Sequence, residues 1–148
     1  MKSFGYALQG IFSALKSERH MRIHACFAFY VIAAGFVTGL DLLSWTAVLI
    51  CIALVFSLEM LNTALESLCD GVTKERRPEI KKAKDCAAGA VLFSACISAV
   101  VGCAVFFSSG RPEAALNFAL EHKAAAGIIV LTLPAWIYFI FKKGDHAK

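Results

Sequence analysis

The chain has 148 residues, 59% of them hydrophobic, and carries a formal net charge of +4. It is far more apolar than a typical soluble domain, which argues against an ordinary soluble enzyme. Because the apolar residues fall in long blocks, we expect several membrane-spanning helices around which the rest of the chain is organised.

The expected elements are all helical. Residues 3–16 have an apolar and a polar face and are too polar to cross a bilayer, so they predict an amphipathic helix in the membrane interface. Four apolar stretches of near the required roughly 20 residues follow. They cover residues 21–40, 42–69, 86–107 and 124–141, with a break at 108–112 and a short amphipathic piece at 113–122. We therefore predict an all-α integral membrane helical bundle, with a core at 1–107 and a C-terminal extension at 108–148.

Basic residues predict the orientation of the spans. They gather before the first span, between the second and third, and after the fourth: Lys2, Lys16, Arg19, Arg22, Lys74, Arg76, Arg77, Lys81, Lys82, Lys84, Lys142, Lys143 and Lys148. The other connections hold only Arg111 and Lys123. The positive-inside rule then places both termini and residues 71–85 in the cytoplasm. The net charge thus indicates topology and contact with anionic lipid, and no nucleic-acid partner is expected.

Other patterns favour ordinary structural roles. The six cysteines stand singly in apolar segments without a CxxC pair, so we expect them to be packing residues. His20 and His24 are spaced to share a helix face, but no third metal ligand stands nearby, which favours interfacial histidines. No signal peptide is apparent. The chain also has no glycine-rich phosphate-binding loop of the soluble-kinase type.

The end of the second span carries a polar stripe. At about 100° per residue, Glu59, Glu66 and Asp70 share one helix face, and Asn62 lies beside them, placed to orient Glu59. Glu59 is expected just inside the apolar layer, with Glu66 about 10 Å further along the axis. Ionisable groups at such depths are costly and by default mark function. The alternatives are that the stripe joins helices or lines a pore.

Two further charged clusters face the same side of the membrane. Lys81, Lys82, Lys84 and Asp85 open the third span, where small residues at 87–90 let helices approach closely. Taken alone, these lysines are more often membrane anchors than functional groups. The other cluster, Glu18, Arg19 and Arg22, opens the first span. Acids with lysines and arginines at one membrane face are typical of a site for Mg²⁺ with a nucleotide, because Mg²⁺ favours one or two carboxylates plus phosphates.

Two blocks of the chain carry a family resemblance. They read Glu59-x-x-Asn62-Thr-Ala-x-Glu66-x-x-x-Asp70 and Ala83-Lys84-Asp85-x-Ala87-Ala88-Gly89-Ala90-Val91-Leu92. Both are similar to the signature of the small prokaryotic diacylglycerol kinase family, and the likeness covers roughly residues 3–107. It implies a homotrimer with active sites shared between subunits at the cytoplasmic face of the bacterial inner membrane. The implied reaction is transfer of the γ-phosphoryl group of ATP to a lipid hydroxyl, with Mg²⁺.

The resemblance also implies roles for individual residues. Glu59 matches the general base, and Asn62 and Asp70 match polar positions that support catalysis. Glu18 and Glu66 match acids linked to the metal. The positions that match nucleotide contacts are Tyr6, Glu18, Glu66, Glu75, Lys84 and Asp85, with Arg77 standing where the family often has a histidine.

The lipid acceptor is left open between two alcohols. The phrases Arg22-Ile23-His24 and Leu43-Ser44-Trp45 look more like the branch that phosphorylates undecaprenol, which we therefore favour over diacylglycerol. The fourth span has no counterpart in the shortest family members, which have three. A non-enzymatic channel or scaffold is a remote alternative, because a pore needs no convergence of Glu18, Glu66 and Lys84 on one face.

Overall fold

The computed structural model describes residues 2–73, 75, 77–107 and 110–142, and within them the regular structure is entirely α-helical. The six described helices are α1 (Lys2–Ser17), α2 (Arg19–Val37), α3 (Leu42–Val72), α4 (Pro78–Phe106), α5 (Arg111–Glu121) and α6 (Lys123–Phe141). Part of the predicted linker, residues 108–109, lies outside the described residues, as do the basic residues Lys74, Arg76, Lys143 and Lys148.

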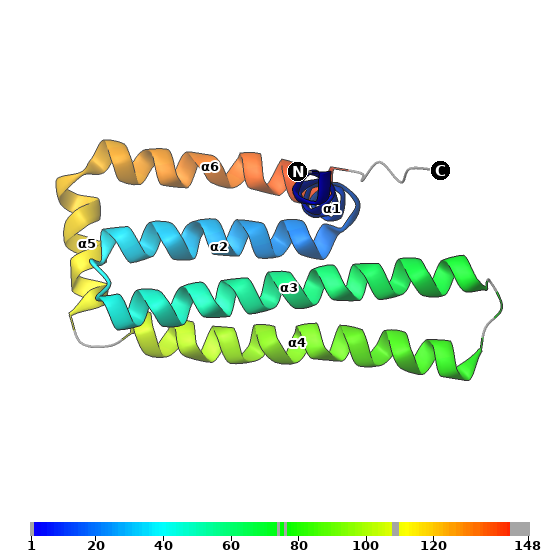
Figure 1. Cartoon of the computed structure of the whole chain (residues 1–148). Coiled ribbons are helices and arrows are strands. Elements are labelled where there is room, and N and C mark those ends of the chain that lie inside the picture. The colour runs from blue at the N-terminus through cyan, green and yellow to red at the C-terminus, as the bar shows by residue number, and fades with distance from the viewer. Residues whose placement is uncertain (1, 74, 76, 108–109, 143–148) are drawn as a thin grey trace.

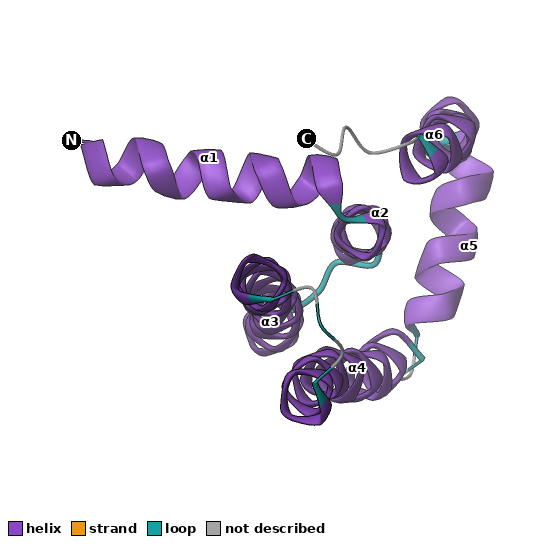
Figure 2. Ribbon diagram, turned by 90° about the vertical axis from the view of Figure 1, so that its right-hand side faces the viewer, coloured by secondary structure: helices purple, strands orange, loops and turns teal. Residues whose placement is uncertain are grey.

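Four of these helices run alongside one another (Figure 1), and each is long and apolar enough to cross a membrane. They are α2, α3, α4 and α6. Helix α1 lies across one end of the bundle and points away from it, whereas α5 lies across the opposite end and joins α4 to α6 (Figure 2). The predicted all-α bundle with four apolar spans and a crosswise first helix is therefore confirmed.

The α3–α4 hairpin is longer than its two predicted spans. Helix α3 continues to Val72, and α4 begins at Pro78, eight residues before the expected start at 86. Proline suits the first turn of a helix, and the acidic Glu79 in that turn interacts favourably with the helix dipole. The hairpin therefore extends beyond α1 as two paired helices that carry the charged residues (Figure 1).

A tight turn sets the packing of α2 on α3. Gly39 has a φ of 61°, which favours glycine, and α3 then begins with Asp41 as its N-cap. Near the end of α2, a Cβ atom on Gly35 would lie 2.7 Å from the indole of Trp45. The two helices thus approach closely because Gly35 has no side chain.

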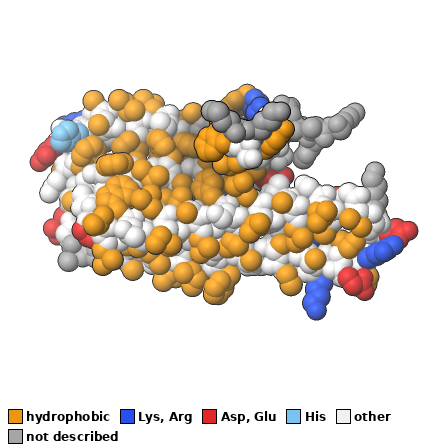
Figure 3. Space-filling view, viewed as in Figure 1, with side chains coloured by type: hydrophobic (Ala, Val, Ile, Leu, Met, Phe, Trp, Pro, Cys, Tyr) orange, Lys and Arg blue, Asp and Glu red, His pale blue; other side chains and the backbone are white. Residues whose placement is uncertain are grey.

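Most apolar side chains of the bundle face outward. Met21 is the one large side chain that is fully buried among the described residues, while leucines and phenylalanines along α3, α4 and α6 are exposed. Hydrophobic side chains cover the flank seen in Figure 3, and charged ones gather toward the ends. This distribution fits a chain surrounded by lipid. All six cysteines are free; Cys69 is buried, whereas Cys86, Cys96 and Cys103 are exposed and do not pack within one chain.

Candidate active site

The site begins at the corner where α1 meets α2. Glu18 is the N-cap residue of α2, yet its side chain makes no capping hydrogen bond, so the carboxylate is not used to satisfy the helix end. Glu59 of α3 lies against this corner and is 4% exposed. The charges of His20, Glu18 and Glu66 all act on the Glu59 carboxyl group. The buried Glu59 therefore lies within electrostatic range of two other acids, Glu18 and Glu66.

Beyond the corner, the polar stripe continues along α3. Asn62 Nδ2 donates to Glu66 Oε1 at 3.0 Å, so Asn62 orients Glu66 in place of the expected Glu59. The reason is spacing: residues four apart lie on neighbouring turns of one helix face. The Oδ1 atom of Asn62 is buried and has no partner among the described residues, which leaves one acceptor available at the centre of the stripe.

Helix α4 brings a cation to the same stripe. Lys84 Nζ donates to Asp70 Oδ1 at 2.5 Å, and the charge of Glu66 also acts on Lys84. The residue of α3 that Lys84 contacts is therefore Asp70. The small residues at 88–90 are exposed and not pressed against α3, and a Cβ atom on Gly89 would meet nothing within 4 Å. In a single chain, the face of α4 that could pack closely against another helix therefore points outward.

The remaining sequence-predicted residues lie apart from this cluster. Tyr6 stands on the outlying part of α1 and is 68% exposed. Asp85 is exposed on α4. Glu75 and Arg77, in the α3–α4 connection, pair with each other at 3.1 Å and are also exposed. One chain thus links Asn62 with Glu66 and Asp70 with Lys84 along the stripe, and it leaves the other four proposed nucleotide contacts outside these pairs.

The spacing of the acids bears on how a metal ion could be held. Over the described ranges, no three His, Cys, Asp or Glu side chains are close enough together to hold a metal ion unaided. The donor set nevertheless fits Mg²⁺, which takes one or two carboxylates and completes its shell with water and substrate phosphates. Glu18 and Glu66 are the carboxylates that the family resemblance assigns to this role.

Two contacts at the corner were missed by the sequence-based prediction. His20 Nδ1 lies 4.0 Å from Glu59 Oε1. Arg22 is 5% exposed and donates from Nη1 to the backbone oxygen of Lys16 at 2.9 Å. His20 and Arg22 follow Glu18 by two and four positions, and the spacing of four between Glu18 and Arg22 was the available signal.

An apolar groove lies beside the site. It is formed by α2, α3 and α4, has a volume of about 460 Å³, and its lining is almost entirely apolar. On α3 it is lined by Val55 and Phe56, one turn from Glu59, and it continues to Phe106 and Phe107 at the far end of α4. A long apolar chain would fit this shape.

Comparison with known proteins identifies the family. The model named prokaryotic diacylglycerol kinase matches residues 5–106. The chain belongs to this family. It is therefore an ATP-dependent lipid kinase and a multi-pass membrane protein of prokaryotic type. The match ends where α4 ends, so α5 and α6 of this lipid kinase lie outside the family model.

The names of individual relatives point to two different lipid substrates. An undecaprenol kinase of Bacillus subtilis is 41% identical over 71% of this chain and 85% of its own length. A diacylglycerol kinase of Synechocystis is also 41% identical, over 68% of this chain but 58% of its own length. A diacylglycerol kinase of Haemophilus influenzae is 33% identical over 72% of this chain and 91% of its own length. No solved structure matches the lipid kinase with significance.

Proposed function

We propose that this lipid kinase phosphorylates undecaprenol, at a site on the cytoplasmic face of the bacterial inner membrane. One observation carries the proposal: the buried Glu59 stands between the apolar groove and the polar end of the α3–α4 hairpin. A lipid hydroxyl and a soluble nucleotide would meet at such a boundary. The basic residues around the α1–α2 corner and the hairpin support the cytoplasmic orientation.

The proposed reaction uses Glu59 as the general base. Its carboxylate accepts the proton of the lipid hydroxyl while the hydroxyl oxygen attacks the γ-phosphorus of ATP. The bond from that phosphorus to the bridging oxygen breaks, and ADP leaves. Lys84, held by Asp70, is available to neutralise charge on the phosphates, which is the main requirement of this chemistry. Mg²⁺, held by Glu18 and Glu66, would neutralise the remaining phosphate charge.

The length of the groove favours undecaprenol over diacylglycerol. At about 1.5 Å per residue, the lining residues from Ala95 on α4 to Phe107 at its end span about 18 Å along the helix axis. One leaflet accounts for about 15 Å, half of the hydrocarbon core. The acyl chains of diacylglycerol end near the middle of the membrane, whereas a polyprenyl chain fills the groove to its far end. The undecaprenol kinase name of the Bacillus subtilis relative agrees with this choice.

The separated nucleotide contacts support a homotrimer with shared sites. Tyr6 lies 12 residues before Glu18 on a helix that points away from its own bundle (Figure 2), so it is positioned to reach a neighbouring chain. The exposed small residues at 88–90 would allow a helix of that neighbour to approach closely. The same assembly would complete the set of nucleotide contacts that one chain leaves open.

A competition assay tests the substrate. The purified chain in mixed micelles receives ATP labelled at the γ-phosphate, Mg²⁺, and equal amounts of undecaprenol and diacylglycerol. We expect labelled undecaprenyl phosphate to predominate. Predominant labelling of diacylglycerol would reverse the choice of lipid, and a folded preparation that labels neither would contradict the proposed reaction.

A variant pair tests the groove itself. Gly102 lines the groove, and a Cβ atom there would meet nothing within 4 Å, so Gly102→Leu places a side chain in the path of the lipid tail. We expect a several-fold higher KM for undecaprenol, with the KM for diacylglycerol retained. Gly127→Leu on α6 is the matched control, since it also adds a side chain in open space but lies outside the groove. Equal behaviour of the two variants would remove the groove as the tail site.

A further inference from the structure

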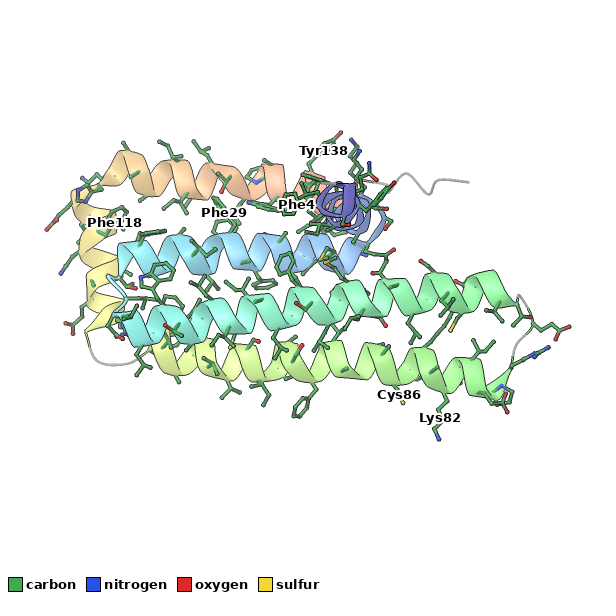
Figure 4. All side chains as sticks on the ribbon, viewed as in Figure 1. Phe4, Phe29, Lys82, Cys86, Phe118 and Tyr138 are labelled. Carbon is green, nitrogen blue, oxygen red and sulfur yellow. The ribbon has the colours of Figure 1, made fainter. Side chains whose placement is uncertain are left out.

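Helix α6 packs along α2, the helix that opens with the catalytic corner. In the middle of the two helices, the Tyr30 hydroxyl and Thr132 Oγ1 are hydrogen-bonded at 2.7 Å. Next to this bond, the rings of Phe29 and Trp136 lie 5.7 Å apart, and Figure 4 shows Phe29 between the two helices. The extension outside the family model is therefore attached to α2 by specific contacts.

The end of α6 reaches the corner itself. The Arg19 guanidinium lies over the ring of Phe141, 4.5 Å from its centroid, and the Arg22 guanidinium lies 5.8 Å from the centroid of Phe139. Such cation–π contacts are attractive, and more so when water is excluded. Both arginines belong to the first turn of α2, directly after Glu18.

Arg22 connects α6 to the position of Glu18. Its Nη1 donates to the Lys16 carbonyl, one of the last carbonyls of α1 that have no partner within that helix. Its own backbone nitrogen bonds the backbone oxygen of Glu18 at 3.4 Å. Arg22 thereby joins the end of α1 to the start of α2 on either side of Glu18, and its burial leaves it little freedom to move.

We propose that α5 and α6 form a brace for the active site, in which Phe139 and Phe141 hold the two arginines and Arg22 fixes the corner that directs Glu18 toward the metal–nucleotide site. This proposal rests on the proposed function, because it needs Glu18 to serve the metal. Arg22 is a positioning residue in this scheme and touches neither substrate nor metal. An α6 that only added lipid contact would have no need of contacts at the corner.

Metal binding by the full-length protein tests the brace without relying on turnover. We would measure Mn²⁺ binding by electron paramagnetic resonance, with a non-hydrolysable ATP analogue, for Phe139→Leu/Phe141→Leu. We expect the Kd for Mn²⁺ to rise about fivefold, in keeping with the loss of one to two cation–π contacts. Tyr138→Leu is the matched control, because Tyr138 is 71% exposed and points away from α2 (Figure 4). Phe139→Trp/Phe141→Leu, which keeps a ring over Arg22, should recover part of the loss.

The outcomes separate the brace from general packing. An unchanged Kd in the double variant, or an equal rise in Tyr138→Leu, would overturn the proposal. If the double variant fails to fold, the Kd of Arg22→Lys for Mn²⁺ is measured in its place, because this variant keeps the charge but loses the planar guanidinium. A folded Arg22→Lys protein with wild-type Mn²⁺ affinity would also overturn it. A wild-type chain that neither binds the Mn²⁺–nucleotide nor labels lipid would instead remove the proposed function on which the brace depends.

Discussion

Glu59 has the environment that its proposed role requires. It is nearly inaccessible, faces the corner residues Glu18 and His20, and lies one turn from the apolar groove. A carboxylate in such a position can accept a proton from a group held in the apolar layer while acids nearer the water serve the metal. The neighbouring stripe is organised as well, because Asn62 holds Glu66 and Asp70 holds Lys84.

A pH-dependent contribution to stability is expected at Asp41, outside the membrane-spanning helices. The backbone N–H and hydroxyl of Ser44 both donate to its carboxylate at 2.9 Å and lower the pKa of Asp41, and the Arg111 guanidinium adds to the effect. Because the folded-state pKa is depressed, this stabilisation is present above the ordinary value of about 4 and is lost as the pH falls through the lowered value.

Thermal unfolding in micelles checks this expectation. We expect the Tm of the wild-type chain to fall below about pH 4 and the Tm of Asp41→Asn to fall less. Glu113→Gln, at an exposed carboxyl group of α5, should behave as the wild type does. Parallel Tm curves for the wild type and Asp41→Asn would contradict the assignment.

The sequence was more informative about spacing along one helix than about contacts between helices. The spacing along α3 placed Glu59, Glu66 and Asp70 on one helix face. Once α3 and α4 are taken to form a hairpin, Lys84 is expected beside these acids, and it contacts Asp70. The spacing did not reveal that Arg111 reaches Asp41 across 70 positions, because such a contact depends on how α5 crosses the end of the bundle. The contacts of Arg22 with α6 were missed for the same reason.

Among the helices, α2 and α3 approach closely at the end of the bundle opposite the candidate site. The relevant contact is that of Gly35 with Trp45, where an added Cβ atom would lie 2.7 Å from the indole. We expect Gly35→Ala to destabilise the chain by about 1–3 kcal/mol, as overpacking typically does. Gly127→Ala on α6 is the control, since nothing lies within 4 Å of its added methyl group.

Circular dichroism during heating in detergent gives the unfolding temperature of both variants. Gly35→Ala should unfold at a clearly lower temperature, and Gly127→Ala should match or exceed the wild type because alanine favours helix more than glycine does. A Gly35→Ala protein as stable as the wild type would show that the indole moves aside without cost.

The four spans were predictable from the sequence, whereas their exact ends were not. Apolar length alone marked the spans, but α3 and α4 continue through charged residues because nothing in those segments breaks a helix before Thr73 or after Pro78. The prediction therefore ended the second span three residues short of Val72 and missed eight residues of α4. These residues form the projecting hairpin that carries Lys84.

For the whole molecule, the proposed sharing of sites between chains makes a specific prediction. We expect Tyr6→Ala and Glu59→Gln each to impair lipid phosphorylation at low ATP concentration. Chains of the two variants are then mixed in detergent, under conditions in which subunits exchange, and the mixture is assayed for lipid phosphorylation. If Tyr6 serves a neighbour's site, some mixed trimers contain a fully intact site and activity is recovered. Mixing without any recovery, while the chains demonstrably exchange, would place both residues in the site of one chain.

The proposed role of Glu59 is to accept the proton of the lipid hydroxyl, and this role is measured by single-turnover transfer of labelled phosphate to lipid in the Glu59→Gln variant. The substitution keeps the size of the side chain and removes its basicity. We predict that transfer slows at least about 100-fold, while nucleotide binding and assembly stay at the wild-type level and Glu113→Gln remains fully active. Near-normal transfer by a folded, nucleotide-binding Glu59→Gln protein would show that Glu59 is not the general base.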